Sequence, residues 1–362
     1  MAVVGAGIVG AAAAWQLVRR GRSVVLLERF TQGHSRGSSH GSARIFRLAY
    51  PHDDYVRLAQ AALHGWHRLE QESGRTLLTT TGGIDHGHPL VTADLAGALS
   101  RCGAAHELLP PEAAGERWPG LRFDGPVLFQ PDAGRLHADA ALTALHGLVA
   151  DGADVRFEQG VVEVVRSVGG VEVVTASDRW QAEVAVVAVG AWAGDVLLGH
   201  LPLPALQVTV EQPAHFRPLD PSSAWPTFIH HRGGPGASGL AARALYGAPA
   251  MAEEGVKVGV HRAGVPVHPD DGPFTVDPGR LQRLRRYVEA WLPGLDPRPN
   301  APTTCLYTTT PDEDFVVDRR GPLVVAAGFS GHGFKFAPAV GALLADLVEG
   351  RGAAPDRFRL PA

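Results

Sequence analysis

The sequence predicts an α/β protein, α+β at the level of its two domains, in which a Rossmann-like dinucleotide-binding domain is interleaved with a β-rich domain. Three observations support this class: a glycine-rich turn near the start, an apolar run at 184–189, and a Pro- and Gly-punctuated β-rich stretch. A length of 362 residues exceeds what one small core needs. We assign to the nucleotide-binding domain residues 1–80, 137–206 and 312–362, and to the second domain 81–136 and 207–311.

The glycine-rich turn GAGIVG follows a short apolar strand and opens an Ala-rich helix. Gly5 permits the tight turn, Gly7 lets the backbone approach a pyrophosphate, and Gly10 lets the helix pack on the strand. The phosphates are expected at the helix N-terminus beside Ile8, because unpaired N–H groups and the helix dipole favour anions there.

A second apolar run, 24–27, ends in Glu28, an acid placed to accept hydrogen bonds from both hydroxyls of a ribose. The order strand, turn, helix, strand, acid is typical of a dinucleotide-binding unit. FAD, NAD and NADP all use this unit. The acid disfavours a 2′-phosphate, so NADP is the least favoured, and FAD and NAD stay open at this point.

Hydrophobic periodicity predicts the remaining elements. Helices are expected near 93–102, 138–150, 281–291 and 337–348. Strands are expected at 82–86, 127–130, 155–164, 171–176, 184–189 and 323–327. The run at 184–189 is entirely apolar, as expected of a buried parallel strand.

Two histidine motifs are weighed as metal sites. Residues 230–236, His-His-Arg-Gly-Gly-Pro-Gly, are interpreted as a flexible loop. The segment 85–88, Asp-His-Gly-His, offers no convincing third ligand. We therefore expect no metal.

Composition excludes several classes of protein. The net charge of −4 gives no basic field for nucleic acid or a membrane surface. No apolar run reaches the roughly 20 residues that cross a bilayer. The N-terminal segment is the nucleotide motif itself rather than a signal peptide. Cys102 and Cys305 cannot build a disulfide framework. The expectation is a cytoplasmic enzyme, a monomer or small homo-oligomer.

Three separated segments carry a family resemblance: GSSHGSARIFR at 37–47, TCLYT at 304–308 and GFSGHGFK at 328–335. With them the chain resembles the monomeric sarcosine oxidase and N-methyltryptophan oxidase family, flavoenzymes that oxidise the C–N bond of amino acids. The resemblance runs from Gly5 to about residue 350. It implies FAD as the cofactor, and a covalent link to it through Cys305.

The resemblance also implies the residues that bind the cofactor. They are Gly5, Gly7, Ile8, Gly10, Glu28, Arg29, Ser39, His40, Arg44, Val161, Gly190, Trp192, Cys305, Gly328, Gly331, His332, Gly333 and Lys335.

A carboxylate substrate needs fixed cations, and Arg47 and Lys335 match the family's carboxylate clamp. If its segment is helical, Arg44 shares a face with Arg47. The residues alone favour ordinary surface charges here; the resemblance favours a site. A desolvated cationic pocket would lower the pKa of the substrate amine and supply the neutral form that reacts.

The remaining catalytic candidates, besides Arg44, are Lys257, His261, Tyr246 and Tyr307. Lys257 resembles the family's oxygen-activating lysine. The others would line the pocket and orient the amine, with Tyr246 also contacting substrate. Ala43 stands where sarcosine-oxidising members have a threonine. Its lack of a hydroxyl removes one hydrogen bond near the flavin, so how the protein tunes the cofactor stays open.

The expected function is an FAD-dependent oxidase that converts an amino acid and molecular oxygen to imine and hydrogen peroxide. Two alternatives stay open: a dehydrogenase that passes electrons to a quinone or carrier protein, and a flavin subunit of a larger complex. The substrate also stays open among sarcosine, larger N-methylated amino acids, cyclic imino acids such as proline or pipecolate, and a biosynthetic intermediate.

Overall fold

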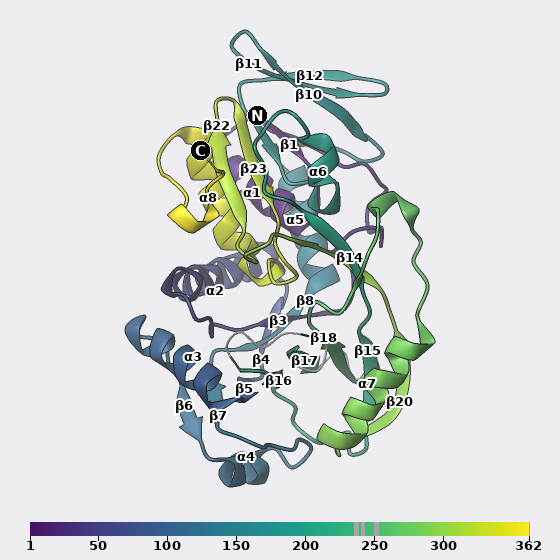
Figure 1. The fold of residues 1–362 in the computed structure, drawn as a ribbon. Coiled ribbons are helices and arrows are strands. Elements are labelled where there is room, and N and C mark those ends of the chain that lie inside the picture. The colour runs from purple at the N-terminus through teal and green to yellow at the C-terminus, as the bar shows by residue number, and fades with distance from the viewer. Residues whose placement is uncertain (235–238, 240–242, 250–252, 362) are drawn as a thin grey trace.

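The computed structural model describes residues 1–234, 239, 243–249 and 253–361. Two large sheets organise the chain, one in the upper half of Figure 1 and one in the lower half. The chain passes between them several times, so each sheet collects strands that are far apart in sequence. The interleaved α/β class predicted from the sequence is confirmed.

The upper sheet has six strands in the order β22-β23-β13-β1-β2-β9, parallel throughout except for β22. Their bounds are Ala2–Val4 (β1), Val25–Leu27 (β2), Asp154–Arg156 (β9), Ala185–Val187 (β13), Val316–Arg320 (β22) and Leu323–Ala327 (β23). The helices of this half are Ile8–Arg19 (α1), Asp53–Ser73 (α2), Ala138–Ala150 (α5) and Ala337–Glu349 (α8). Helix α1 packs against both α5 and α8, which is why its alanines are fully buried.

The lower sheet has eight strands in the order β20-β15-β18-β17-β16-β5-β7-β6, antiparallel except for the parallel pair β16 and β5. The bounds are Gly83–Gly87 (β5), Glu107–Leu109 (β6), Val127–Gln130 (β7), Ala214–Pro218 (β15), Thr227–His231 (β16), Leu245–Pro249 (β17), Val256–Val260 (β18) and Leu295–Pro302 (β20). Helices Pro89–Arg101 (α3), Pro111–Arg117 (α4) and Pro278–Trp291 (α7) border it (Figure 1).

Three small sheets complete the fold. One joins Ala43–Phe46 (β3), Leu78–Thr80 (β4) and Gly134–His137 (β8); the next joins Val161–Ser167 (β10), Gly170–Thr175 (β11) and Arg179–Ala182 (β12); the last joins Gln207–Glu211 (β14), Val265–Pro266 (β19) and Cys305–Thr309 (β21). Short helical turns are Gly190–Trp192 (η1), Ala193–Val196 (α6), Pro269–Asp271 (η3), Phe334–Phe336 (η4) and Asp356–Phe358 (η5).

Three local expectations were wrong. The strand expected at 155–164 is interrupted, and Glu158 there has a left-handed backbone with φ of 60°. Arg44 lies in strand β3 rather than in a helix, because residues 43–46 pair with β8. His230 and His231 belong to strand β16 rather than to a loop. Of that expected loop, residues 235 and 236 lie outside the described residues.

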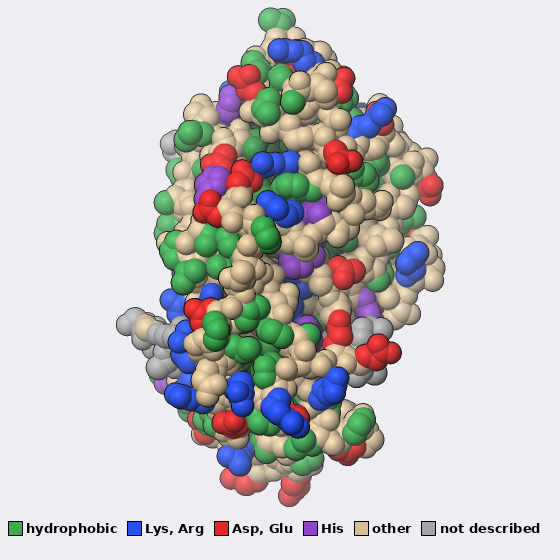
Figure 2. Space-filling model, turned by 90° about the vertical axis from the view of Figure 1, so that its right-hand side faces the viewer, with side chains coloured by type: hydrophobic (Ala, Val, Ile, Leu, Met, Phe, Trp, Pro, Cys, Tyr) green, Lys and Arg blue, Asp and Glu red, His purple; other side chains and the backbone are tan. Residues whose placement is uncertain are grey.

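The surface in Figure 2 mixes acidic, basic and histidine side chains over the face that it shows, in keeping with the small net charge. Among the helices of the described ranges, none is both long and apolar enough to cross a bilayer.

Candidate active site

A cavity of about 920 Å³ lies at the carboxyl ends of strands β1, β2 and β13. Residues of β17, β18 and β21 form its other wall. In open parallel sheets, this edge is where ligands bind. The cavity thus has one end beside the glycine turn and the parallel sheet, and another end against strands β17, β18 and β21.

At the sheet end, the glycine turn is built for close approach. Gly5 has φ of +95°, a conformation that favours glycine. A Cβ on Gly10 would lie 1.9 Å from the Gly5 carbonyl oxygen, so position 10, in the first turn of helix α1, has room only for glycine. The Ser39 hydroxyl accepts a hydrogen bond of 3.1 Å from the Ile8 N–H and so brings the 37–40 loop against the helix N-terminus.

Glu28 lies beside the glycine turn, where the sequence predicts a ribose. Its carboxylate is buried and accepts hydrogen bonds from the backbone N–H groups of Ala6, at 2.8 Å, and Phe30, at 3.0 Å. Burial would raise its pKa, but hydrogen bonds from His34, Ala6 and Phe30 outweigh burial and lower the pKa. A carboxylate that stays ionised keeps lone pairs for ribose hydroxyls. These residues fit the ADP half of FAD.

Beyond Glu28, three side chains form an interaction that the sequence did not reveal. The Arg29 guanidinium pairs with Asp270 at 2.9 Å, and the Trp192 indole N–H donates to the same carboxylate at 2.8 Å. Asp270 thus links Arg29, which follows β2, to Trp192 in η1, which follows β13. Nothing in the local sequence of Asp270 marks it, because its partners lie far away in the chain.

Four cations gather at the other end: Arg44, Arg47, Lys257 and Lys335. The Arg44 guanidinium donates to the carbonyl oxygens of Ser38 (2.9 Å) and His40 (2.6 Å), and so holds the 38–40 loop. Burial, followed by the charges of Arg44 and Lys257, lowers the pKa of His40 to about 4. His40 is therefore a neutral imidazole at neutral pH.

The two lysines are buried. Lys257 points from β18 toward the Ala43 carbonyl oxygen, 3.4 Å from its Nζ atom. Burial, followed by repulsion from Arg44, lowers the pKa of Lys257 to about 7. Lys335 donates to the Tyr50 hydroxyl at 2.9 Å and the His332 carbonyl oxygen at 2.8 Å. Burial and the nearby charge of Arg47 hold the pKa of Lys335 well below its usual range.

Arg47 is held by a buried network that sequence reasoning missed. Its Nη1 atom contacts the Asp85 carboxylate at 3.2 Å and the Ala49 carbonyl oxygen. Asp85 also accepts one hydrogen bond of 2.8 Å from the Gln130 amide, and its carboxylate lies 2.8 Å from Nε2 of His231. Arg47 also hydrogen-bonds to the Tyr50 side chain, and its guanidinium lines the cavity.

The opposite wall is aromatic. Tyr246 and Tyr307 hydrogen-bond to each other through their side chains, and burial raises the pKa of both hydroxyls. The His261 ring lies 5.8 Å from the Tyr307 ring, and its Nε2 atom lies 3.8 Å from Glu313. Both tyrosines are therefore neutral hydrogen-bonding groups, as orienting an amine requires.

The remaining predicted residues also line the cavity: Val161, Gly190, Cys305, Gly328, Gly331, His332 and Gly333. A Cβ on Gly331 would lie 2.0 Å from the Tyr307 ring, so glycine is required where the two segments meet. Burial raises the pKa of the Cys305 thiol, against the opposing effect of Lys257 and Arg44. Apart from Gly10, behind the turn, each predicted site residue contributes to this cavity wall.

One sequence signal for the site was overlooked. The chain has two lysines, Lys257 and Lys335, among its 33 Lys and Arg residues, and both are buried in this cavity. All the other basic side chains of the Lys and Arg total are arginines, and they include Arg44 and Arg47 of the same cavity. Lysine is a compact charge whose pKa shifts readily on burial, whereas arginine stays charged. Lysine therefore occurs at two buried positions where a compact charge with a shifted pKa can be placed.

Having two lysines makes their pKa values measurable one by one. In Cys305→Ala protein freed of cofactor and labelled with ¹³C-lysine, two Cε resonances are expected, which Lys257→Met assigns. Both should titrate below the usual value of about 10.4, with Lys257 near 7. Titration of both resonances near the ordinary value would show that the lysines are solvated and the site open.

Comparisons with known proteins agree with this geometry. The family described as FAD dependent oxidoreductase matches residues 1–347. Human peroxisomal sarcosine oxidase is 36% identical over 95% of this chain and 90% of its own length. Monomeric sarcosine oxidase of Bacillus sp. (strain B-0618) is 32% identical over 96% of this chain and 91% of its own. The structure of NikD, an unusual amino acid oxidase essential for nikkomycin biosynthesis, superimposes with a TM-score of 0.85 at 29% identity, covering 99% and 96% of the two chains.

Fold and site together define an FAD-dependent enzyme. The chain belongs to the FAD-dependent oxidoreductase family, and the resemblance to sarcosine oxidases drawn from the three motifs is confirmed.

Proposed function

We propose that this protein is an FAD-dependent oxidase of the C–N bond of a secondary, N-methyl or cyclic amino acid, giving imine and hydrogen peroxide. The observation that carries the proposal is the cluster of four cations at one end of a cavity whose other end fits a dinucleotide. When bound, FAD would accept the equivalent of a hydride, two electrons and one proton, from the carbon beside nitrogen and would pass the electrons to oxygen.

The protein's own groups would divide this work. Arg47 and Lys335 bind the substrate carboxylate, since a guanidinium fork pairs with two oxygens. The positive field of the cluster favours the neutral amine, whose lone pair is needed for C–H oxidation. Tyr246 and Tyr307 orient the nitrogen from the facing wall. Lys257, buried beside Arg44, offers positive charge to oxygen as it gains electrons.

The relatives support an amino-acid substrate. Two are named sarcosine oxidases and NikD is named an amino acid oxidase. We expect a substrate side chain to meet residues of β16, of β17 and of the position just before β17, where the lining residues Ile229, Ala248 and Ala244 are small or apolar. We infer a small or cyclic substrate side chain. A cytoplasmic location is also part of this proposal, although two relatives are named peroxisomal.

A peroxide-release screen of the purified chain tests the proposal. Primary, secondary and cyclic amino acids are offered in air, with a peroxidase-coupled dye as the detector. Peroxide release with at least one secondary or cyclic amino acid is expected. Flavin that no amino acid reduces under anaerobic conditions would contradict an amino-acid substrate of any kind.

We further propose that FAD is joined covalently through Cys305. The thiol lies in the cavity wall at the start of β21, where the charges of Lys257 and Arg44 counteract part of the rise in its pKa that burial causes. Acid-precipitated protein is then expected to stay yellow and to carry the mass of one FAD. Cys305→Ala should release the flavin on denaturation, whereas Cys102→Ala, with its thiol near Asp53 on α2, should not. Quantitative recovery of free FAD from denatured wild type would exclude the bond.

A further inference from the structure

On the far side of the strands that hold Asp85 and His231, two more histidines meet. Strands β5 and β16 run parallel, and their register places His86 opposite His230. Neighbouring residues of a strand point to opposite faces of a sheet. Asp85 and His231 therefore face the substrate cavity, while His86 and His230 face the other way and take no part in the proposed function.

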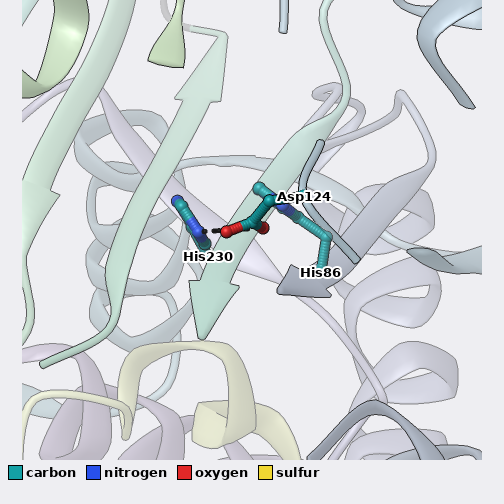
Figure 3. A group of neighbouring side chains, drawn as sticks. All are labelled: His86, Asp124 and His230. Atoms are coloured by element: carbon teal, nitrogen blue, oxygen red, sulfur yellow. Dashed lines mark ion pairs between the residues drawn. The ribbon is translucent and has the colours of Figure 1, made fainter. Parts of the chain in front are cut away.

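A carboxylate completes this second cluster. Asp124 lies in the segment between α4 and β7, and its Oδ1 atom is 3.8 Å from Nε2 of His230 (Figure 3). A Cβ on Gly125 would lie 2.2 Å from the Gly87 carbonyl oxygen, so this segment packs directly on the end of β5. One ligand atom from each of His86, Asp124 and His230 lies within 4.8 Å of the others. Neither histidine motif, 85–88 or 230–236, supplies a complete set of ligands by itself. The fold brings one histidine of each motif together with Asp124.

His86 is the observation that calls for a ligand. It is 1% exposed, and neither of its ring nitrogens has a hydrogen-bond partner among the described residues. Buried polar groups are normally hydrogen-bonded, and an unpaired one costs free energy. Its ring stacks on His230 at 4.3 Å and meets the edge of Phe123. Burial holds the pKa of His86 well below its usual range, so it is the neutral imidazole that binds metals.

His230 is already oriented as a ligand. Its Nδ1 atom is 3.1 Å from the Tyr287 hydroxyl of α7, and Nε2 faces Asp124. Burial lowers the pKa of His230 to about 4. In the tautomer whose Nδ1–H donates to this hydroxyl, Nε2 keeps its lone pair for a metal, the outer hydrogen bond that metal-binding histidines usually make. The Trp291 ring meets the imidazole edge-on, with ring centroids 4.5 Å apart.

We propose that His86, His230 and Asp124 form a binding site for a divalent transition metal such as zinc. Two imidazoles and one carboxylate, with water in the fourth position, are a common donor set for this ion. Ligands of one zinc lie about 3.3 Å apart, so ligand atoms now up to 4.8 Å apart must approach one another by up to about 1.5 Å. His86 must also turn out of its stack, which breaks no hydrogen bond within the described structure. Asp124, with its side chain 54% exposed, provides the entry path.

The ion would tie the 118–126 segment to β5 and β16. It would act as a structural link rather than as a reagent, because the cavity lies on the opposite face of β5 and β16, where Asp85 and His231 point. The site is thus independent of the proposed oxidase function, and either can fail without the other.

Equilibrium dialysis of the tag-free flavoprotein against zinc, read by elemental analysis, tests the site. Wild type is expected to bind about one zinc per chain with a Kd of about 1 μM or tighter. Asp124→Asn, at a half-exposed position that leaves the core untouched, should weaken binding at least about tenfold, and His86→Leu should abolish it. The double variant His64→Gln, His67→Gln, which removes exposed histidines of α2, should bind as wild type does.

X-ray absorption of the zinc-loaded protein gives a second readout, with two imidazoles and oxygen donors expected in the first coordination sphere. Unchanged zinc binding by both Asp124→Asn and His86→Leu would overturn the proposal, because the ion would then sit elsewhere. Less than about a fifth of an equivalent bound by wild type would overturn it as well.

Discussion

Lys257→Met is expected to slow reoxidation of the reduced enzyme by oxygen by about 100- to 1000-fold, the scale of losing one well-placed electrostatic stabiliser. Methionine keeps the length of the stem but removes the charge. Oxygen gains negative charge only in the second half of the reaction, so anaerobic reduction by substrate should slow only modestly. Stopped-flow absorbance resolves the two steps.

The pH dependence of reoxidation gives an independent check on the same charge. The pKa of Lys257 is lowered to about 7, so its ammonium is present below that pH and lost above it. The reoxidation rate should fall as the pH rises through the pKa, and the fall should be absent in Lys257→Met. A bound anionic ligand nearby moves the step to higher pH. Reoxidation of the variant at the wild-type rate would place the function of Lys257 elsewhere.

Arg47→Ala is expected to raise the substrate dissociation constant by about 30-fold or more. Removing one partner of a buried charge-assisted pair costs about 2–5 kcal/mol, and 1.4 kcal/mol is a factor of ten. The loss also leaves Asp85 without its guanidinium partner. Titration of the flavin absorbance with simple carboxylates measures affinity without turnover.

Two further variants sharpen this test. Arg47→Lys keeps the charge but loses the planar fork, so its affinity should fall between wild type and Arg47→Ala. Arg68→Ala removes an exposed charge on α2, remote from the cavity lining, and should leave affinity unchanged. If Arg47→Ala bound substrate and carboxylates as wild type does, the clamp would be ruled out.

Sequence reasoning reached the elements whose signals are local. The helix expected at 138–150 and the strand at 323–327 have these bounds in the structure, because periodicity and apolar runs report burial directly. The glycine turn with Glu28 likewise encodes its geometry in a few adjacent residues. Arg44 lines the cavity, but it does so from strand β3 rather than from a helix, because β3 is set by pairing with β8.

The residues that were missed depend on contacts between distant strands. Asp85 meets Arg47, Gln130 and His231 only because β5 pairs with both β7 and β16. Asp270 meets Arg29 and Trp192 across the cavity mouth. The spacing of residues along the sequence does not reveal which strands pair or in which register. The presence of two lysines was the readable signal, and composition by residue type would have found it.

The most direct test of the central claim is the stoichiometry of oxygen use by the purified single chain with its best amino acid. The account predicts one molecule of oxygen consumed and one of peroxide formed per amine oxidised, with no added acceptor or partner chain. Reduced enzyme that stays reduced in air, and turns over only with a quinone or a carrier protein, would contradict it.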